Sequence, residues 1–321
     1  MKFFSHDEIL EKLTYDLCIP AVRAAMIAVS RGETRQLPRG ILSLEQDRKL
    51  GVMTGALSHP GPFGSKLVSV FPDNFDRGMP SHQGIVVLFD RETGTPMAAA
   101  EGGSITAIRT ACASAVATDS LARPDARHLA LLGYGEQAET HLHAIRLVRS
   151  LDKVTVWGRS RERAQAFAER MGEETGLAVV TATTARDAVA EADIVCTVTH
   201  AKEPILLGEW VAPGTHLNVV GSGGPGPVEI DHDLVVKSRF IADSRENVLM
   251  AGAEFLKAKE AGLIGDGHIA AEIGEVLSGD IPGRRSAEEI TLYKSLGHIM
   301  QDLASLAAIL DAEPDSSLLS E

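Results

Sequence analysis

The feature that most constrains the fold is the stretch LALLGYGEQAETHLHAI, which begins at Leu129. An apolar run typical of a buried strand leads into the pattern G-x-G-x-x-A at Gly133, Gly135 and Ala138, and a helical segment follows. The first glycine allows a tight turn, the second lets the backbone approach a pyrophosphate, and the small third residue lets helix and strand pack closely. The N–H groups at the start of such a helix bind phosphate. The stretch therefore predicts a dinucleotide-binding unit.

The chain after this stretch alternates between apolar and charged segments. The apolar runs VTVWGRS, AVVTA, DIVCTVT, HLNVVGSG and RFIADS are typical of strands, and the charged segments RERAQAFAERMGEE and TARDAVAEA between them are typical of helices. This alternation predicts an α/β fold with a parallel, doubly wound sheet.

The glycine motif at 133–138 is called the fingerprint below. The residues before it have a different pattern of secondary structure from those after it. Residues 1–30 are expected to be helical, with Ser5 and Glu8 forming a capping box. SKLVSVFP is typical of a strand, and GIVVLFDRETGTPMAAAEG predicts a hairpin that turns at Thr93–Gly94. This first region is therefore expected to be α+β. The segment TLYKSLGHIMQDLASLAAIL near the end of the chain is expected to be one long amphipathic helix.

Composition excludes several classes of function. The net charge of −13, with no cluster of lysine and arginine, argues against nucleic acid as a partner. The sequence contains no apolar run of 18 residues, so no membrane span is predicted. The three cysteines are widely spaced and contain no CxxC pair, which favours reduced thiols and a cytoplasmic location. No metal site is expected, since the eleven histidines are scattered and His141 and His143, at i,i+2 on a helix, face apart.

The second strand of the dinucleotide unit ends in WGRSRER. Proteins that bind NAD usually place an acid here for the ribose hydroxyls, whereas this chain offers Arg159, Ser160 and Arg163. Arginine with a hydroxyl suits a 2′-phosphate, which favours NADP(H) and leaves NAD(H) open. The alternative is that Arg161 and Arg163 are solvated residues of the first helical turn.

The glycine-rich run GSGGPGP (221–227) follows the strand HLNVV. It lacks the Lys-Ser/Thr of a P-loop. At the carboxyl end of a Rossmann strand, such a run is expected to approach the nicotinamide and the substrate closely.

Four cationic side chains in the first region stand in apolar or small-residue surroundings: Arg39, Lys66, His82 and Arg109. Each one alone is equally well explained as a charge at a strand end or on the surface. Together they predict a pocket for an anion, most simply a carboxylate.

Several segments, in consistent order from about residue 35 to 305, resemble the ornithine cyclodeaminase/mu-crystallin family. They are PSHQGIVVLFDRETGTPMAAAEGGSITAIRTACASAVAT, LLGYGEQAETH, VWGRSRERAQAFAE, VTHAKEPILLGEWVAPGTHLNVVGS and TLYKSLGHIMQD.

The resemblance implies a Rossmann domain inserted into an α+β domain that binds substrate and forms a homodimer. We expect the substrate-binding and dimerisation domain at 1–118 with a C-terminal helix at 290–312, and the dinucleotide domain at 119–289. The chemistry shared by the family is hydride exchange between a nicotinamide and the α-carbon of an amino or imino acid.

The resemblance also implies roles for individual residues. Arg39 and Arg109 match the arginines that bind the substrate carboxylate, Lys66 matches the lysine near the imine nitrogen, and His82 is a further candidate for substrate contact and proton donation. Lys66 and Arg109 are the candidate catalytic residues. The predicted cofactor contacts are Thr110, Gly133, Gly135, Glu136, Gln137, Ala138, Trp157, Arg159, Ser160, Arg163, Thr197, Val198, Thr199, Val220, Gly221 and Ser222.

One departure from the family pattern decides between activities. Ornithine cyclodeaminases carry an aspartate in the loop after the fifth Rossmann strand, and here that position is Gly223. Without a carboxylate, ring closure lacks a base for the ω-amino group. The expected function is therefore an NAD(P)H-dependent reductase of α-imino acids. The alternatives are an ornithine- or lysine-type cyclodeaminase and a non-catalytic protein that binds a small ligand together with NADPH.

Overall fold

The computed structural model describes residues 1–224 and 226–313, without the side chains of Phe75 and Asp76. The chain forms two compact units. The first comprises Met1–Arg109 and the residues from His298 onward, and the second comprises Thr110–Gly297. The units therefore divide within helix α3 (Gly102–Leu121), whereas the sequence placed the boundary at 118/119, and the chain returns to the first unit after Gly297 rather than at 290.

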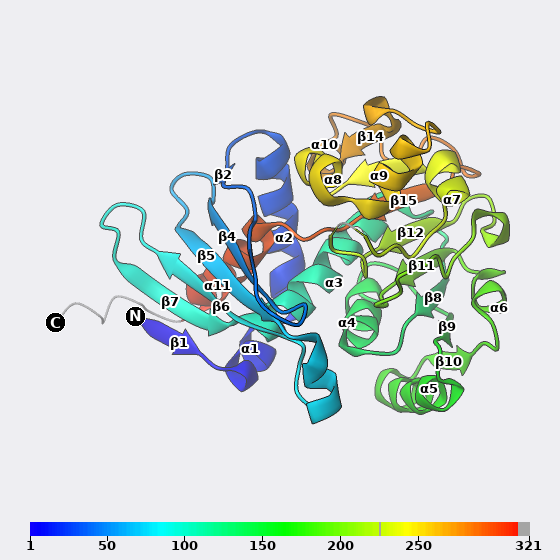
Figure 1. Cartoon of the computed structure of the whole chain (residues 1–321), viewed down its shortest axis with the longest axis horizontal. Coiled ribbons are helices and arrows are strands. Elements are labelled where there is room, and N and C mark those ends of the chain that lie inside the picture. Colours follow the sequence, from blue (N-terminus) through cyan, green and yellow to red (C-terminus); the bar gives the residue numbers. More distant parts are fainter. Residues whose placement is uncertain (225, 314–321) are drawn as a thin grey trace. The chain divides into compact units, whose positions relative to one another are not determined.

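The first unit is built on a mixed sheet in the order β1-β7-β6-β5-β4-β2, with β3 also paired to β4 (Figure 1). The predicted hairpin is present, because β6 and β7 pair antiparallel around the turn at Gly94. The strands are β1 (Lys2–Phe4), β2 (Arg35–Gln36), β3 (Gly40–Ser43), β4 (Lys49–Ala56), β5 (Phe63–Val70), β6 (His82–Phe89) and β7 (Pro96–Glu101).

Helices cover one face of this sheet. Helix α11 (Ile299–Ala312) packs on β4, β5 and β6, and α2 (Tyr15–Ser30) packs on α11. The predicted capping box of Ser5 and Glu8 begins the short helix α1 (His6–Lys12). The expectation of helix throughout residues 1–30 misses two features: β1 runs parallel to β7, and the chain turns between α1 and α2. A 3-10 helix spans Pro72–Arg77.

The second unit is a parallel sheet in the order β10-β9-β8-β11-β12-β15-β13-β14. The order of its first five strands is that of a Rossmann fold, with β8 central and the strand order reversing on either side of it. The strands are β8 (His128–Leu132), β9 (Lys153–Trp157), β10 (Ala178–Thr181), β11 (Ile194–Thr197), β12 (His216–Val219), β13 (Arg239–Ala242), β14 (Ile269–Glu272) and β15 (Thr291–Lys294).

Helices connect these strands, and two buried apolar clusters pack between helices and sheet. The helices are α4 (Glu136–Ile145), α5 (Arg161–Thr175), α6 (Ala185–Val189), α7 (His232–Lys237), α8 (Arg245–Ala251), α9 (Ala253–Glu260) and α10 (Ile273–Leu277), with 3-10 turns at Gly208–Trp210 and Asp266–His268. The α/β class with a doubly wound sheet is confirmed.

The expectation of a single helix from residue 290 to 312 is wrong in its first part. Residues 291–294 form β15, which lies inside the parallel sheet between β12 and β13, and the helix begins only at Ile299. All four residues of β15 are buried. A strand buried on both faces shows no alternation of polar and apolar residues, so its pattern merged with that of the following helix.

Among the described residues, no single helix is long and apolar enough to cross a membrane; α1 and α2 meet that test only when taken together, across a bend of 86°.

Candidate active site

In the first unit, two of the four predicted cations share one buried carboxylate. Lys66 Nζ donates to Asp302 Oδ1 at 2.7 Å, and Arg109 Nε donates to the same oxygen at 3.1 Å. The sequence missed Asp302. It lies on α11, within a stretch of helix that is buried on all sides, and it is itself fully buried. The fold therefore brings β5, α3 and α11 together around one ion cluster.

Further polar contacts fix the two cations. Lys66 Nζ donates to Thr106 Oγ1 at 2.5 Å, and Arg109 Nη1 donates to Gln301 Oε1 at 2.8 Å. Within the described residues, these bonds leave the third proton of Lys66 and the Nη2 group of Arg109 for a ligand.

The charges in the cluster shift one another's protonation. Burial lowers the pKa of Lys66 to about 8; Asp302 opposes this shift, while Arg109 and Arg39 add to it. Burial on its own raises the pKa of the Asp302 carboxyl, but the charges and hydrogen bonds of Arg109 and Lys66 outweigh it and hold that pKa below its usual range. Asp302 is therefore ionised at neutral pH, and Lys66 can exchange a proton near neutral pH.

Arg39 lies in the exposed segment between β2 and β3, and its charge acts on both Lys66 and His298. Its charge therefore reaches the cluster of Lys66 and Asp302. His298, which the sequence did not single out, is buried and forms the N-cap of α11.

His82 stands apart from this cluster within the first unit. It is exposed at the first position of β6 and pairs with Val70, whereas Lys66 pairs with Val86, four residues further along the same strand. Four residues of strand span about 13 Å. The His82 ring lies 2.9 Å from the Ser81 hydroxyl, in line with a local structural role.

In the second unit, the fingerprint forms the turn that the sequence predicted. Gly133 follows β8 with φ 134°, a backbone conformation that favours glycine, and a Cβ there would lie 2.8 Å from the Val198 carbonyl oxygen. A Cβ at Gly135 would meet nothing within 4 Å. The backbone is therefore open above Gly135, where the motif needs room for a pyrophosphate.

The start of α4 fits the same ligand. Gly135 is the N-cap and supplies no side-chain hydrogen bond, so no capping side chain competes with phosphate oxygens at the start of the helix. Glu136 and Gln137 are the first two residues of the helix, the Oε1 atom of Gln137 is buried without a partner, and Ala138 is fully buried against the sheet. These features fit a bound dinucleotide.

The predicted 2′-phosphate region lies after β9. Arg159, Arg161 and Arg163 are all exposed, and the Ser160 hydroxyl accepts a hydrogen bond from the Arg163 backbone N–H as the N-cap of α5. The pKa of His200, in the segment after β11, is lowered first by burial and then by the charge of Arg159. This part of the unit is therefore cationic.

A buried glutamate joins the segments that follow β11 and β12. Glu229 Oε2 accepts from Thr197 Oγ1 and from the Gly221 backbone N–H, and its Oε1 accepts from the backbone N–H and the hydroxyl of Thr199, each at 2.7 Å. Burial raises the pKa of Glu229, against these hydrogen bonds. The sequence identified Thr197, Thr199 and Gly221 as cofactor contacts but missed the residue that holds them together.

A second buried set fixes the start of the glycine-rich run. Lys294 Nζ lies 2.6 Å from Ser222 Oγ and 3.0 Å from Glu254 Oε2, and the Ser222 hydroxyl also donates to Glu254. All three side chains are about 1% exposed. Gly223, where cyclodeaminases carry the aspartate, has open space around its Cα. Pro225, within the same run, lies outside the described residues.

Three further predicted contacts lie at the carboxyl ends of the strands of the second unit. Trp157 ends β9 and its carbonyl accepts from the Gly133 N–H, while the N–H groups of Val198 and Val220 donate to residues at the ends of β8 and β11. Thr110 is buried on α3, directly after Arg109.

Within the described residues, one group of three side chains has the spacing of metal ligands: Glu139, His143 and Glu174. Arg170 forms ion pairs with both glutamates, at 2.7 Å and 3.9 Å. The negative charge of the two glutamates is therefore already balanced by Arg170.

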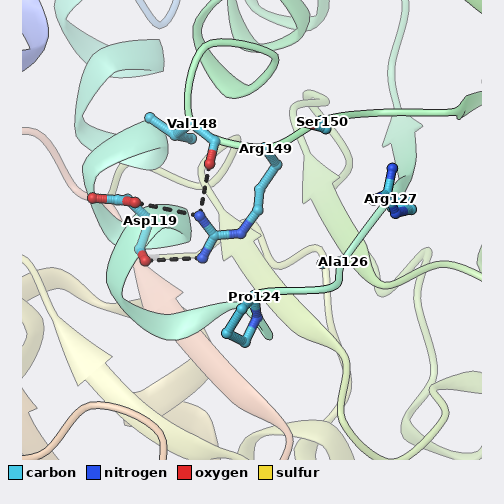
Figure 2. A pocket seen from close by; sticks show the side chains of 7 residues that line it. All are labelled: Asp119, Pro124, Ala126, Arg127, Val148, Arg149 and Ser150. Atoms are coloured by element: carbon cyan, nitrogen blue, oxygen red, sulfur yellow. Dashed lines mark hydrogen bonds and ion pairs between the residues drawn. The ribbon is translucent and has the colours of Figure 1, made fainter.

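A shallow pocket in the second unit is unrelated to the fingerprint (Figure 2). Its lining includes Arg127, which precedes β8, and Ser150, which precedes β9, so it lies at the amino ends of these strands. Rossmann ligands bind at the carboxyl ends. Figure 2 shows Arg149 bonded to the Asp119 carbonyl and side chain, at the end of α3, and the same guanidinium bonds the Thr118 and Ala122 carbonyls. Arg149 therefore closes the C-terminus of α3.

The geometry defines a class: a protein whose second unit is a Rossmann fold suited to a dinucleotide and whose first unit carries a cationic cluster suited to a carboxylate. The chain belongs to the ornithine cyclodeaminase/mu-crystallin family, whose model matches residues 2–316.

Three relatives place the chain within this family. The ketimine reductase mu-crystallin of Rattus norvegicus is 36% identical over 317 residues, 97% of this chain and 96% of its own length. The Δ1-pyrroline-2-carboxylate reductase of Thermococcus litoralis, solved with NADH and L-proline, has a TM-score of 0.94 and 34% identity over 97% of each chain. An archaeal alanine dehydrogenase, solved as a dimer with bound NAD, has a TM-score of 0.91 and 30% identity over 97% of this chain and 95% of that one.

Proposed function

We propose that the chain is an NAD(P)H-dependent reductase of α-imino acids of the ketimine or pyrroline-2-carboxylate type. The observation that carries this proposal is the charge of the first unit's cluster. Lys66 and Arg109 bring two positive charges to one buried carboxylate, that of Asp302, and the charge of Arg39 acts on Lys66 as well. An anionic ligand balances the excess, and a substrate carboxylate matches the donor geometry of arginine and lysine. The ketimine and pyrroline-2-carboxylate reductases among the relatives support the same reaction.

The residues of the cluster divide the work. Arg109 and Arg39 hold the carboxylate, which fixes the orientation of the neighbouring C=N carbon. Lys66 donates a proton to the imine nitrogen, since its pKa of about 8 leaves it mostly protonated at pH 7 yet able to release the proton. A bound nicotinamide supplies the hydride that the imine carbon accepts.

The proposed coenzyme is NADP(H), with NAD(H) as the second choice. Arg159 and Arg163 are exposed after β9, and no acid precedes Glu162 in that segment, which suits a 2′-phosphate. Among the relatives, the pyrroline-2-carboxylate reductase binds NADH and the alanine dehydrogenase binds NAD, so both coenzymes belong in the assay.

The test is the oxidation of NADPH and of NADH in the presence of pyrroline-2-carboxylate, its six-membered homologue and an acyclic imino acid. Turnover with at least one of these substrates supports the proposal. Coenzyme binding without turnover across the panel would favour the non-catalytic binding protein. Ammonia release from ornithine or lysine without added coenzyme would establish a cyclodeaminase, although Gly223 supplies no carboxylate for that reaction.

We also propose a homodimer formed through the first unit's sheet. The face opposite Lys66 carries several exposed apolar side chains: Phe3 is 56% exposed, Leu42 58%, Ile85 39% and Met97 37%. Exposed apolar side chains that share one face of a sheet can form an interaction site. Light scattering coupled to size exclusion measures the mass, and a monomer of 34.1 kDa would contradict the proposal.

A cytoplasmic location remains a proposal, supported by three buried cysteines outside any disulfide.

A further inference from the structure

The imidazole of His298 has one nitrogen in use and one without a partner. Nδ1 accepts a hydrogen bond from the Met300 backbone N–H at 3.2 Å, as the N-cap of α11. Nε2 is buried and has no hydrogen-bond partner in the described part of the chain. The side chain is about 1% exposed.

The N-cap bond decides which nitrogen carries the proton. A neutral imidazole has one donor and one acceptor nitrogen, and because Nδ1 accepts, Nε2 must donate. Burial lowers the pKa of His298 to about 4; Asp302 opposes the shift, while Arg109 and Arg39 add to it, so the ring is neutral at pH 7. Leaving such a buried donor unpaired costs about 1–3 kcal/mol.

The surroundings indicate what this donor is for. The charged groups that act on the ring are Asp302, one turn further along α11, Arg109 on α3, and Arg39 from the segment after β2. Asp302 Oδ2 is also buried without a partner, yet it makes no hydrogen bond with His298. The ring therefore lies one helical turn before the carboxylate that Lys66 and Arg109 share, with its N–H still without a partner in the described part of the chain.

We propose that His298 is a further substrate-binding residue, whose Nε2–H donates a hydrogen bond to the substrate carboxylate beside Arg109 and Lys66. The inference rests on the proposed function for the identity of the ligand. A neutral donor adds a directed bond without adding a further positive charge to the cluster.

The experiment separates this bond from the capping role. His298→Asn keeps an N-cap side chain, since asparagine is among the preferred caps, but is too short to place a donor at the Nε2 position. His298→Ala removes both. His232→Asn, at an exposed helix position in the second unit, is the matched control.

Two substrates and one binding analogue give the readout. For pyrroline-2-carboxylate we expect kcat/KM to fall about 10- to 100-fold in both His298 variants, mainly through KM, with NADPH binding unchanged. For 1-pyrroline, the same ring without the carboxylate, we expect a change of less than twofold. Calorimetric binding of pyrrole-2-carboxylate, a planar analogue that is not reduced, should weaken by a similar factor in His298→Asn.

The inference would be overturned if His298→Asn bound pyrrole-2-carboxylate as wild type does, or if it lost activity on both ring substrates equally. Failure of the proposed function looks different. In that case wild type would reduce no imino acid, while binding of the carboxylate analogue would still depend on His298.

Discussion

Asp302 and Lys66 form a buried ion pair, with Oδ1 and Nζ 2.7 Å apart and side-chain exposures of 0% and 4%. Arg109 shares the same oxygen. The charges of Lys66 on β5 and Arg109 on α3 are thus balanced by one carboxylate on α11. The ion pair therefore links the stability of the first unit to the protonation of Lys66, its proposed acid.

Replacing Asp302 with asparagine should destabilise the protein and change its pH profile. Removing one partner from a buried ion pair typically costs about 3–5 kcal/mol, because the other charge is left uncompensated. The pKa of Lys66 should fall below 8, since Asp302 is the charge that raises it. Chemical denaturation measures the first effect. Asp311→Asn, at an exposed position of the same helix, is the control and should change stability little; equal loss in both variants would contradict the ion-pair account.

Lys66 should set the alkaline limit of activity. If the protonated amine donates to the imine, kcat/KM falls as the pH rises through about 8, because the profile of kcat/KM follows the free enzyme. Lys66→Arg should move this limb to higher pH, and Lys66→Met should remove it together with most of the activity. A limb that persists in Lys66→Arg but disappears in His82→Gln would assign the proton to His82 instead. The pH profile is measured with a substrate whose imine pKa is known, so that the titration of the substrate can be separated from that of the enzyme.

Arg109→Lys tests whether the guanidinium geometry matters rather than its charge. Lysine keeps the charge but cannot bond Asp302, Gln301 and a carboxylate in one plane. We expect a lower kcat/KM for pyrroline-2-carboxylate, corresponding to a loss of about 2–4 kcal/mol of transition-state stabilisation. Steady-state kinetics at saturating NADPH measures the loss. Arg146→Lys, outside the cluster, should retain full activity. Full activity in Arg109→Lys as well would rule out the proposed role of the Arg109 guanidinium in holding the substrate carboxylate.

Glu229→Gln should loosen the coenzyme site. Each carboxylate oxygen accepts two hydrogen bonds, and an amide nitrogen in place of one oxygen would face the backbone N–H of Gly221 or Thr199. Leaving a buried backbone donor unpaired costs about 1–3 kcal/mol, so the Kd of NADPH should rise about 5- to 100-fold. Fluorescence titration of NADPH measures the Kd, with Glu209→Gln as the control, since Glu209 lies on a 3-10 turn and its carboxylate bonds only Trp210 among the described residues. An unchanged Kd in Glu229→Gln would show that the segments after β11 and β12 keep their positions without the Glu229 carboxylate.

The sequence predicted those parts of the molecule that local pattern determines. The glycine fingerprint at Gly133, the hairpin at Gly94 and the capping box of Ser5 each depend on a few neighbouring residues, and all three are present. The predicted cations Lys66 and Arg109 lie together, but the acid that joins them was not found, because an acidic residue in sequence is usually solvated.

Two kinds of residue needed the tertiary structure. Glu229 and Lys294 become buried and paired only when the carboxyl ends of β11, β12 and β15 and the residues that follow them come together, and no local pattern encodes that pairing. Asp302 did leave a trace. It lies with Gln301 and Ser305 in the part of α11 from residue 299 to 310, which is otherwise apolar, and polar residues in such a segment must find buried partners.

Arg159 should set the coenzyme preference. Its exposed guanidinium follows β9, where an arginine can pair with a 2′-phosphate, and its charge already acts on His200 nearby. We expect Arg159→Glu to raise the KM for NADPH about 10- to 100-fold, because a charge-assisted hydrogen bond contributes about 1.5–3 kcal/mol and the new carboxylate repels the phosphate. The KM for NADH should change less than threefold. Arg161→Glu, on the first turn of α5, is the matched control and should alter neither value. Equal effects on NADPH and NADH in Arg159→Glu would mean that the residue supports the fold of this segment rather than reading the phosphate.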